Sequence, residues 1–102
     1  MGFDDLNPLL HSQLRLAIMS LLVSVENADY SFIKEQTEAS SGNISVQMSK
    51  LEEADYIKVT KSFKNKKPNT SYEITEKGIA AFEEYVETIG QYLKASNQND
   101  KS

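Results

Sequence analysis

Hydrophobic residues recur at helical spacing over residues 12–25, where the pattern predicts a first helix with Ser12 as its N-cap. One face of this helix is apolar, as expected for packing on a core. A second apolar cluster, formed by Leu16, Met19 and Val23, falls on the opposite face at about 100° per residue. A helix that is apolar on both sides must be covered twice, and in so short a chain we expect a partner subunit to supply the second cover.

Two further helices are predicted before the pattern changes. Ser31 is a candidate N-cap for a short helix over residues 32–38, and a third helix is expected from near Ser41 to Ala54. The expected buried stripe of the third helix has the spacing i, i+4 and i+7: Ile44, Met48 and Leu51. Its opposite face is uncharged, small and rich in hydrogen-bonding groups in the N-terminal half, whereas most exposed helix faces carry Glu, Lys and Arg.

From Tyr56 the period of the pattern shortens from about 3.6 residues to about 2, which indicates strands. Residues 56–61 and 70–74 are rich in β-prone side chains, and residues 62–69 between them contain asparagine, proline and three lysines. The pattern predicts a β-hairpin with a basic loop. Residues 26–29 are polar and are expected to be a break between helices.

A last helix is predicted after Thr75, its expected N-cap. Its apolar stripe extends past the small domain, so residues 85–93 have little of their own chain to pack against, which again favours a second subunit. The domain is expected to span residues 1–94, followed by a disordered polar tail over residues 95–102. The expected dimer interface combines apolar residues of the first and last helices: Leu16, Met19, Val23, Tyr85, Val86, Ile89, Tyr92 and Leu93.

The composition fits one small globular domain, because 39% of the 102 residues are hydrophobic and 25% are charged. There is no cysteine and only one histidine, His11, which leaves few groups for a metal site, a thiol nucleophile or a catalytic triad. His11 adjoins Ser12, but neighbours in sequence rarely form a catalytic pair, so a capping or packing role is preferred. We therefore expect no enzyme activity, no metal and no cofactor.

The net charge of −4 conceals a basic segment. Residues 56–72 contain five lysines and no acid, whereas residues 73–102 contain six acids and three lysines. A segment of one charge sign suits a polyanionic partner. The alternative is that the lysines only protect the edge of a hairpin against pairing with other strands.

Targeting signals are not evident in the sequence. No apolar run approaches the roughly 20 residues that span a bilayer, and the N-terminus lacks the basic region of a signal peptide. A soluble, cytoplasmic protein is expected.

The predicted order of elements is that of a winged helix-turn-helix domain, and three stretches of sequence add to this likeness. The first helix contains LLHSQLRLAI at residues 9–18, and the third helix with its exit contains SGNISVQMSKLEEADYI at residues 41–57. The hairpin and the start of the last helix contain FKNKKPNTSYEITEKG at residues 63–78. The chain resembles small stand-alone winged-helix DNA-binding transcriptional regulators of bacteria and archaea, related to the multiple-antibiotic-resistance and arsenical-resistance repressor superfamily. The resemblance implies a mainly α fold with a small β-hairpin and a long C-terminal dimerisation helix.

One position departs from the pattern of these regulators. Their members usually have glycine where this chain has Asp55, at the residue after the third helix where a positive φ is wanted. Aspartate tolerates the left-handed region better than most residues, so the turn is expected to survive.

The resemblance places the third helix in a major groove and the hairpin, or wing, on the DNA backbone or in an adjacent minor groove. Asn and Gln can pair with adenine edges, Val46 can contact a thymine methyl group, and Ser or Lys can bind phosphate or guanine. Helix capping is the alternative for Ser41 and Asn43, and plain solvated surface is the alternative for Gln47 and Ser49. The expected DNA-binding residues are Ser41, Asn43, Ser45, Val46, Gln47, Ser49, Lys50, Lys61, Lys64, Asn65, Lys66, Lys67 and Asn69.

The function expected from these features is sequence-specific transcriptional regulation by a homodimer on double-stranded DNA, with repression as the favoured mode. The alternative is a winged-helix protein-interaction module that binds no DNA, which the acidic net charge would suit. DNA binding is preferred because a docking surface should carry exposed aromatic residues on the third helix, where this chain has none. No feature of the sequence identifies a small-molecule effector, an operator or a set of target genes.

Overall fold

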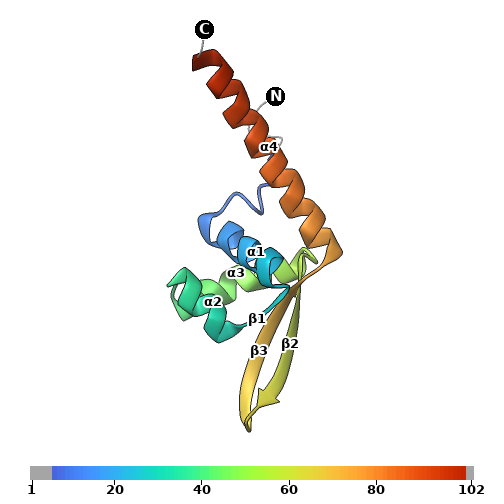
Figure 1. Ribbon diagram of the computed structural model, residues 1–102. Helices are drawn as coiled ribbons and strands as arrows, with labels where there is room; N and C mark the ends of the chain where they lie inside the picture. Colours follow the sequence, from blue (N-terminus) through green and yellow to red (C-terminus); the bar gives the residue numbers. More distant parts are fainter. Residues whose placement is uncertain (1–5, 101–102) are drawn as a thin grey trace.

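The computed structural model describes residues 6–100 and consists of a helical body from which one helix and one hairpin project in opposite directions (Figure 1). Its largest dimension is 62 Å, against 24 and 22 Å across. Helices α1, α2 and α3 form the body, α4 is the projecting helix, and β2 and β3 form the hairpin. The elements in chain order are α1 (Gln13–Val25), β1 (Asn27–Asp29), α2 (Tyr30–Thr37), α3 (Ser41–Glu53), β2 (Ile57–Lys64), β3 (Lys67–Ile74) and α4 (Glu76–Asp100).

Two predicted caps fix where α1 and α4 begin. The Ser12 hydroxyl accepts a hydrogen bond from the backbone N–H of Arg15, and the Thr75 hydroxyl accepts one from the N–H of Gly78 at 2.9 Å. Both bonds satisfy N–H groups that the first turn of a helix leaves unpaired. The predicted starts of α1 and α4 are therefore confirmed.

The strand β1 lies where the sequence predicts only a polar break. It pairs antiparallel with β3, and Ala28 lies opposite Tyr72. The carboxylate of Asp29, at the end of β1, accepts a hydrogen bond from the N–H of Phe32 at 2.9 Å and so caps α2. The prediction that Ser31 caps this helix is wrong, because α2 begins before Ser31.

The β2–β3 hairpin is longer than predicted, and its strand order in the sheet is β1-β3-β2. Strand pairing continues from Ile57 opposite Ile74 to Lys64 opposite Lys67, so most of the predicted loop is strand. Asn65 and Lys66, at φ 54° and 67°, close the hairpin. Two residues with positive φ form the kind of tight turn whose twist matches that of the strands. Proline at position 68 is tolerated because β1 pairs only with residues 71–73, which leaves β3 an edge there.

The core lies where the three body helices pack on the sheet and on the base of α4. The predicted stripe of α3 is confirmed, since Ile44, Met48 and Leu51 are all buried. The segment before α1 also contributes, through Leu6 and Leu10, which the sequence pattern did not indicate as core. These side chains form one buried cluster with residues of α1, the sheet and α4.

Two residues predicted for a dimer interface belong instead to the core of the single chain. Met19 is 0% exposed and Tyr85 is 6% exposed. The sequence assigned the second cover of α1 to a partner subunit, but Leu6 and Leu10 lie in the same buried cluster and supply part of it from the same chain. Met19 is therefore covered by its own chain, whereas Tyr85 still borders a groove between α1 and α4.

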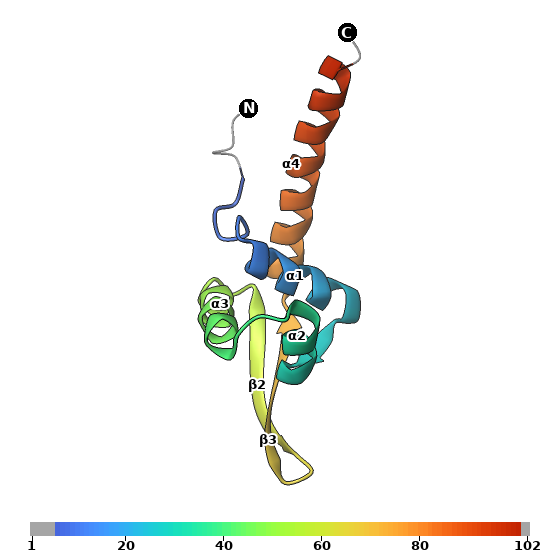
Figure 2. The same ribbon diagram turned by 90° about the vertical axis from the view of Figure 1, so that its left-hand side faces the viewer.

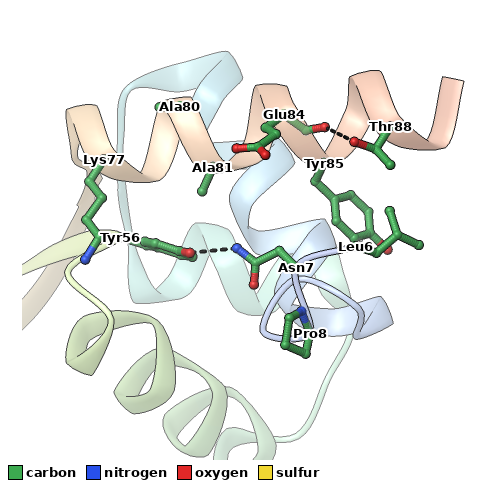
Figure 3. A pocket seen from close by; sticks show the side chains of 10 residues that line it. All are labelled: Leu6, Asn7, Pro8, Tyr56, Lys77, Ala80, Ala81, Glu84, Tyr85 and Thr88. Atoms are coloured by element: carbon green, nitrogen blue, oxygen red, sulfur yellow. Dashed lines mark hydrogen bonds between the residues drawn. The ribbon is translucent and has the colours of Figure 1, made fainter. Parts of the chain in front are cut away.

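The segment before α1 is held by hydrogen bonds to two tyrosines, of which Figure 3 shows the one between Asn7 and Tyr56. Asn7 Nδ2 donates to the Tyr56 hydroxyl at 2.7 Å, and His11 Nδ1 lies 3.0 Å from the Tyr85 hydroxyl. A cavity of about 480 Å³ lies between this segment, Tyr56 and α4. His11 is exposed and contacts Tyr85 through this hydrogen bond.

The end of α3, the end of the hairpin and the start of α4 meet at Tyr56. The N–H of Asp55 donates to Glu52 O at 2.9 Å and the N–H of Tyr56 donates to Leu51 O at 3.0 Å, the pair of bonds of a Schellman motif. Asp55 has φ 67°, so it occupies the left-handed position predicted for it. The Tyr56 carbonyl accepts from the N–H of Thr75 at 3.0 Å, which ties this turn to the start of α4.

Helix α4 extends to Asp100, so the backbone of residues 95–100 is helical where the sequence predicts a disordered tail. Residues 101–102, the rest of the predicted tail, lie outside the described residues. Within the described range, no helix is long and apolar enough to cross a membrane.

Candidate nucleic-acid interface

The exposed face of α3 carries the polar groups that the sequence singled out. Figure 2 shows α3 at one side of the body, with the hairpin extending beyond it. Val46 is 52% exposed, and only Gln47 of the predicted α3 residues is half-buried. The other predicted contacts on this helix are all exposed: Ser41, Asn43, Ser45, Ser49 and Lys50.

A hydrogen-bond chain runs from α1 into this face. The Arg15 guanidinium donates from Nη1 to Gln47 Oε1 and from Nε to the carbonyl of Leu9. Gln47 Nε2 in turn donates to Asn43 Oδ1 at 2.9 Å. The amide of Gln47 is therefore bonded at both ends, while the amide nitrogen of Asn43 has no hydrogen-bond partner among the described residues. Gln47, predicted to contact a base, orients Asn43 in this arrangement.

Arg15 was not predicted as a site residue. It occurs in the sequence only as part of the motif of the first helix, and its partner lies 32 positions further along the chain. The available signal was the only charged residue of α1, since a half-buried guanidinium needs hydrogen-bond acceptors.

The N-terminus of α3 has a cap and a nearby cation. The Ser40 hydroxyl accepts a hydrogen bond from the N–H of Asn43 at 3.2 Å, so Ser40 has the capping role that sequence analysis left open for Ser41 and Asn43. Lys34 Nζ on α2 donates to the Ser41 hydroxyl at 3.2 Å. Lys34 adds a positive charge beside α3 that the sequence did not indicate, because the loop between α2 and α3 brings the two residues together.

The hairpin places its lysines in two groups. Lys64, Asn65, Lys66 and Lys67 lie at the exposed tip, with Lys64 directly opposite Lys67, and the half-buried Asn69 follows them on β3. Lys61 lies nearer the body. The predicted wing residues therefore follow the hairpin from Lys61 to the turn, with Lys64 and Lys67 on the opposite face from Lys61.

A groove of about 400 Å³ joins the hairpin to α3. Ser45 and Ser49 line it from α3, and Lys61 lines it from β2. Tyr72 also borders the groove; burial raises the pKa of its hydroxyl, and Tyr30 and Glu52 raise it further. Tyr72 therefore stays neutral at physiological pH, and the charged residues that line this groove are Lys61 and Glu52.

The acidic residues of the last helix are remote from this surface. Glu83, Glu84 and Glu87 lie on α4, which leaves the body at the end opposite the hairpin (Figure 1). Salt screens exposed charges over about 8 Å at physiological ionic strength. The net charge of −4 therefore does not describe the potential at the wing.

Four of the residues predicted for dimerisation line a second groove, between α1 and α4: Leu16, Tyr85, Val86 and Ile89. It has a volume of about 490 Å³ and an apolar lining that includes Leu16, Phe82, Val86 and Ile89. Val86 and Leu93 are 50% and 62% exposed. The remaining predicted residues, apart from the buried Met19 and Tyr85, are Val23, which is 38% exposed, and Leu16, Ile89 and Tyr92, which are half-buried.

The helices and the hairpin together define a class of protein. Helices α2 and α3 pack on α1 and are followed by the β2–β3 hairpin. Strand β3 of this hairpin also pairs with β1, the short strand after α1. This arrangement is a winged helix-turn-helix fold. Polar groups are exposed on α3, the second helix of the α2–α3 pair, and the hairpin contains five lysines.

Comparison with known proteins places the chain within this class. Residues 14–93 match the model of the winged helix DNA-binding domain family, and the chain belongs to that family. An uncharacterized protein of Methanocaldococcus jannaschii is 32% identical over 84 residues, which cover 82% of this chain and 91% of that protein. The structure of a transcriptional regulator homologue from Pyrococcus horikoshii has the same fold, with a TM-score of 0.80 and 24% identity over 85% of this chain and 86% of that one.

Proposed function

We propose that this protein is a transcriptional regulator that binds a specific DNA sequence as a homodimer, with α3 in the major groove and the β2–β3 wing on the backbone or in the adjacent minor groove. The observation that carries the proposal is the position of the hydrogen-bonding face of α3 beside a hairpin whose residues 57–72 contain five lysines and no acid. Amides and hydroxyls can discriminate base edges, and lysines neutralise phosphates without discriminating between sequences.

Dimerisation would complete the site. The exposed apolar residues around the α1–α4 groove, including Val86 and Leu93, are the surface proposed for the partner. Two copies joined through a two-fold axis present two α3 helices, so the expected DNA site has two inverted half-sites. The proposed mode is repression, by occupying a site that overlaps a promoter, carried out in the cytoplasm and without enzyme activity.

The proposal is tested by selecting binding sites from a pool of random duplexes and measuring affinity for the selected and a scrambled duplex at several salt concentrations. Replacing Asn43 by alanine should cost about 1–3 kcal/mol on the selected duplex and little on the scrambled one, because base contacts discriminate between sequences. Lys66→Ala should weaken binding to both duplexes equally and reduce the salt slope by roughly 0.9 for each phosphate that the protein no longer neutralises.

Lys94→Ala is the matched control for charge, because Lys94 is exposed on α4, away from the wing. It should leave affinity and salt slope unchanged. If the folded wild-type protein enriches no duplex, the proposal fails and a protein-interaction module becomes the better hypothesis.

A further inference from the structure

Phe63 is the most exposed of the large hydrophobic side chains described, at 77%. It lies near the tip of the hairpin, one residue before Lys64. Exposed aromatic side chains of this size lose the stabilisation that burial would give them. This position therefore favours a partner that buries the ring.

The register of the hairpin shows which way Phe63 faces. Pairing is unbroken from Ile57 to Lys64, so alternate residues of β2 share a face and Phe63 lies on the same face as Val59 and Lys61. Val59 and Lys61 line the groove against α3. Phe63 thus continues, towards the tip, the side of the hairpin that is turned to α3.

Pro68 gives this position a second apolar group. It lies directly opposite Phe63 on β3 and is also exposed. The two-residue turn of Asn65 and Lys66 follows only two positions after Phe63, so the strand ladder holds the pair in a fixed place. A rigid apolar pair at the end of a hairpin has the shape of a wedge.

The charges around this wedge favour DNA as the partner. Lys61 shares its face of the hairpin, Lys64 and Lys67 lie next to it on the opposite face, and Lys66 lies in the turn. Residues 56–72 contain no acid. An apolar group with lysines near it suits a partner surface that is anionic at its rim and apolar inside. The minor groove of a duplex is such a surface, because its phosphates flank sugars and stacked bases. The hydrogen-bonding face of α3 on the same side favours this surface over an anionic membrane, which offers no base edges.

We propose that Phe63, supported by Pro68, is a wedge that the wing inserts into the minor groove beside the major-groove site of α3, where it partly unstacks one base step and kinks the duplex. This inference rests on the proposed function. It adds a source of specificity, because base steps differ in the energy needed to kink them. The wing lysines alone would bind every sequence equally.

Phe63→Ala tests the wedge, and Ser62→Ala is its matched control, because Ser62 is exposed on the same strand and faces the opposite side. Phe63→Ala should weaken binding to the selected duplex about tenfold, the loss expected when an apolar ring is no longer buried. Its salt slope should equal that of the wild type because no charge is removed. Phe63→Leu should keep most of the affinity, and Ser62→Ala should change nothing.

A second measurement detects the kink itself. Energy transfer between dyes at the two ends of the selected duplex should show a bend with the wild type and Phe63→Leu, and a straighter duplex with Phe63→Ala. Thermal unfolding should give equal midpoints for all variants, since Phe63 contributes little to the core.

The outcomes separate this inference from the proposed function. Failure of the wild type to bind any duplex would overturn both. Normal binding and bending by Phe63→Ala would overturn the wedge and leave the regulator proposal intact. Phe63-dependent binding to vesicles of anionic lipid, with unchanged binding to DNA, would assign the aromatic ring to a membrane and overturn the wedge as well.

Discussion

Arg15 connects the helix that organises the body to the helix proposed to contact bases. A guanidinium has five donors in a fixed plane, so it can bond the carbonyl of Leu9 and the amide of Gln47 at once. Through Gln47 it sets which group Asn43 presents, namely the amide nitrogen. Asn43 would then favour acceptors on base edges, such as N7 of a purine.

Replacing Arg15 by lysine should therefore reduce sequence discrimination. The lysine ammonium is a point charge on a flexible stem and lacks the fork that bonds both groups, so the ratio of affinities for selected and scrambled duplex should fall about three- to tenfold. The free energy of unfolding should fall by about 1 kcal/mol because one hydrogen bond is removed. Binding titrations and urea unfolding measure the two effects.

Gln47→Ala and the double variant are the controls for this interpretation. If Arg15 acts through Gln47, the losses of discrimination in Arg15→Lys and Gln47→Ala should not add. Additive losses would show that Arg15 contributes to DNA binding by another route.

At single residues, periodicity identified exposure better than it identified hydrogen-bond partners. The spacing of Ile44, Met48 and Leu51 was enough to predict that Asn43 and Ser45 are exposed, as they are in the structure. The bond between Arg15 and Gln47 could not be predicted, because it depends on how two helices pack and not on either helix alone.

At the scale of elements, Gly78 allows α4 to begin against the turn that ends α3. A Cβ atom there would lie 2.2 Å from the Tyr56 carbonyl oxygen and 2.9 Å from Ile74 Cγ1. The Tyr56 carbonyl oxygen cannot move away from such a Cβ atom without disturbing the hydrogen bond that it accepts from the N–H of Thr75. Close approach thus requires glycine at this position of the helix.

Gly78→Ala should destabilise the protein by about 1–3 kcal/mol, because overpacking exceeds the gain in helix propensity. Gly90→Ala on the same helix is the matched control: nothing lies within 4 Å of its added methyl group. That change should stabilise the protein by up to about 1 kcal/mol. Thermal and urea unfolding of both variants give the comparison, and equal effects would refute the packing argument.

The sequence predicted the helices more accurately than the sheet. Caps and apolar stripes are local, and the starts of α1 and α4 followed from Ser12 and Thr75. Strand β1 was missed because only Ala28 is buried, and its pairing partner lies near the far end of the hairpin sequence. The hairpin was predicted too short because Pro68 was taken as a loop residue, although it lies where β3 has no second neighbour.

At the scale of the whole molecule, α4 and α1 leave an apolar surface that a second copy is proposed to cover. Sedimentation equilibrium at micromolar concentration should show a species of about twice 11.5 kDa. Val86→Glu places a charge on that surface and should shift the protein to monomer and weaken DNA binding together. Val25→Glu is the control, because Val25 is 42% exposed at the other end of α1. A wild-type monomer at this concentration would contradict the dimer.

Of the sequence predictions, the set of residues expected at a dimer interface differs most from what the fold of the single chain leaves exposed. Met19 and Tyr85 were assigned to a partner because the sequence does not show that Leu6 and Leu10 fold back into the same cluster. The remaining exposed apolar residues, including Val86 and Leu93, lie mainly on α4. Periodicity alone could not show whether the second apolar face of α1 is buried by the same chain or by another subunit.

The separation of the lysine hairpin from the acidic α4 has a kinetic consequence. A molecule 62 Å long with a basic hairpin at one end and a net acidic α4 on the other side of the body behaves as an electric dipole in the field of a polyanion. Approaching DNA would turn the hairpin forward and α4 away before any contact forms, so more encounters would start in a productive orientation. Added salt should then slow association more than it speeds dissociation.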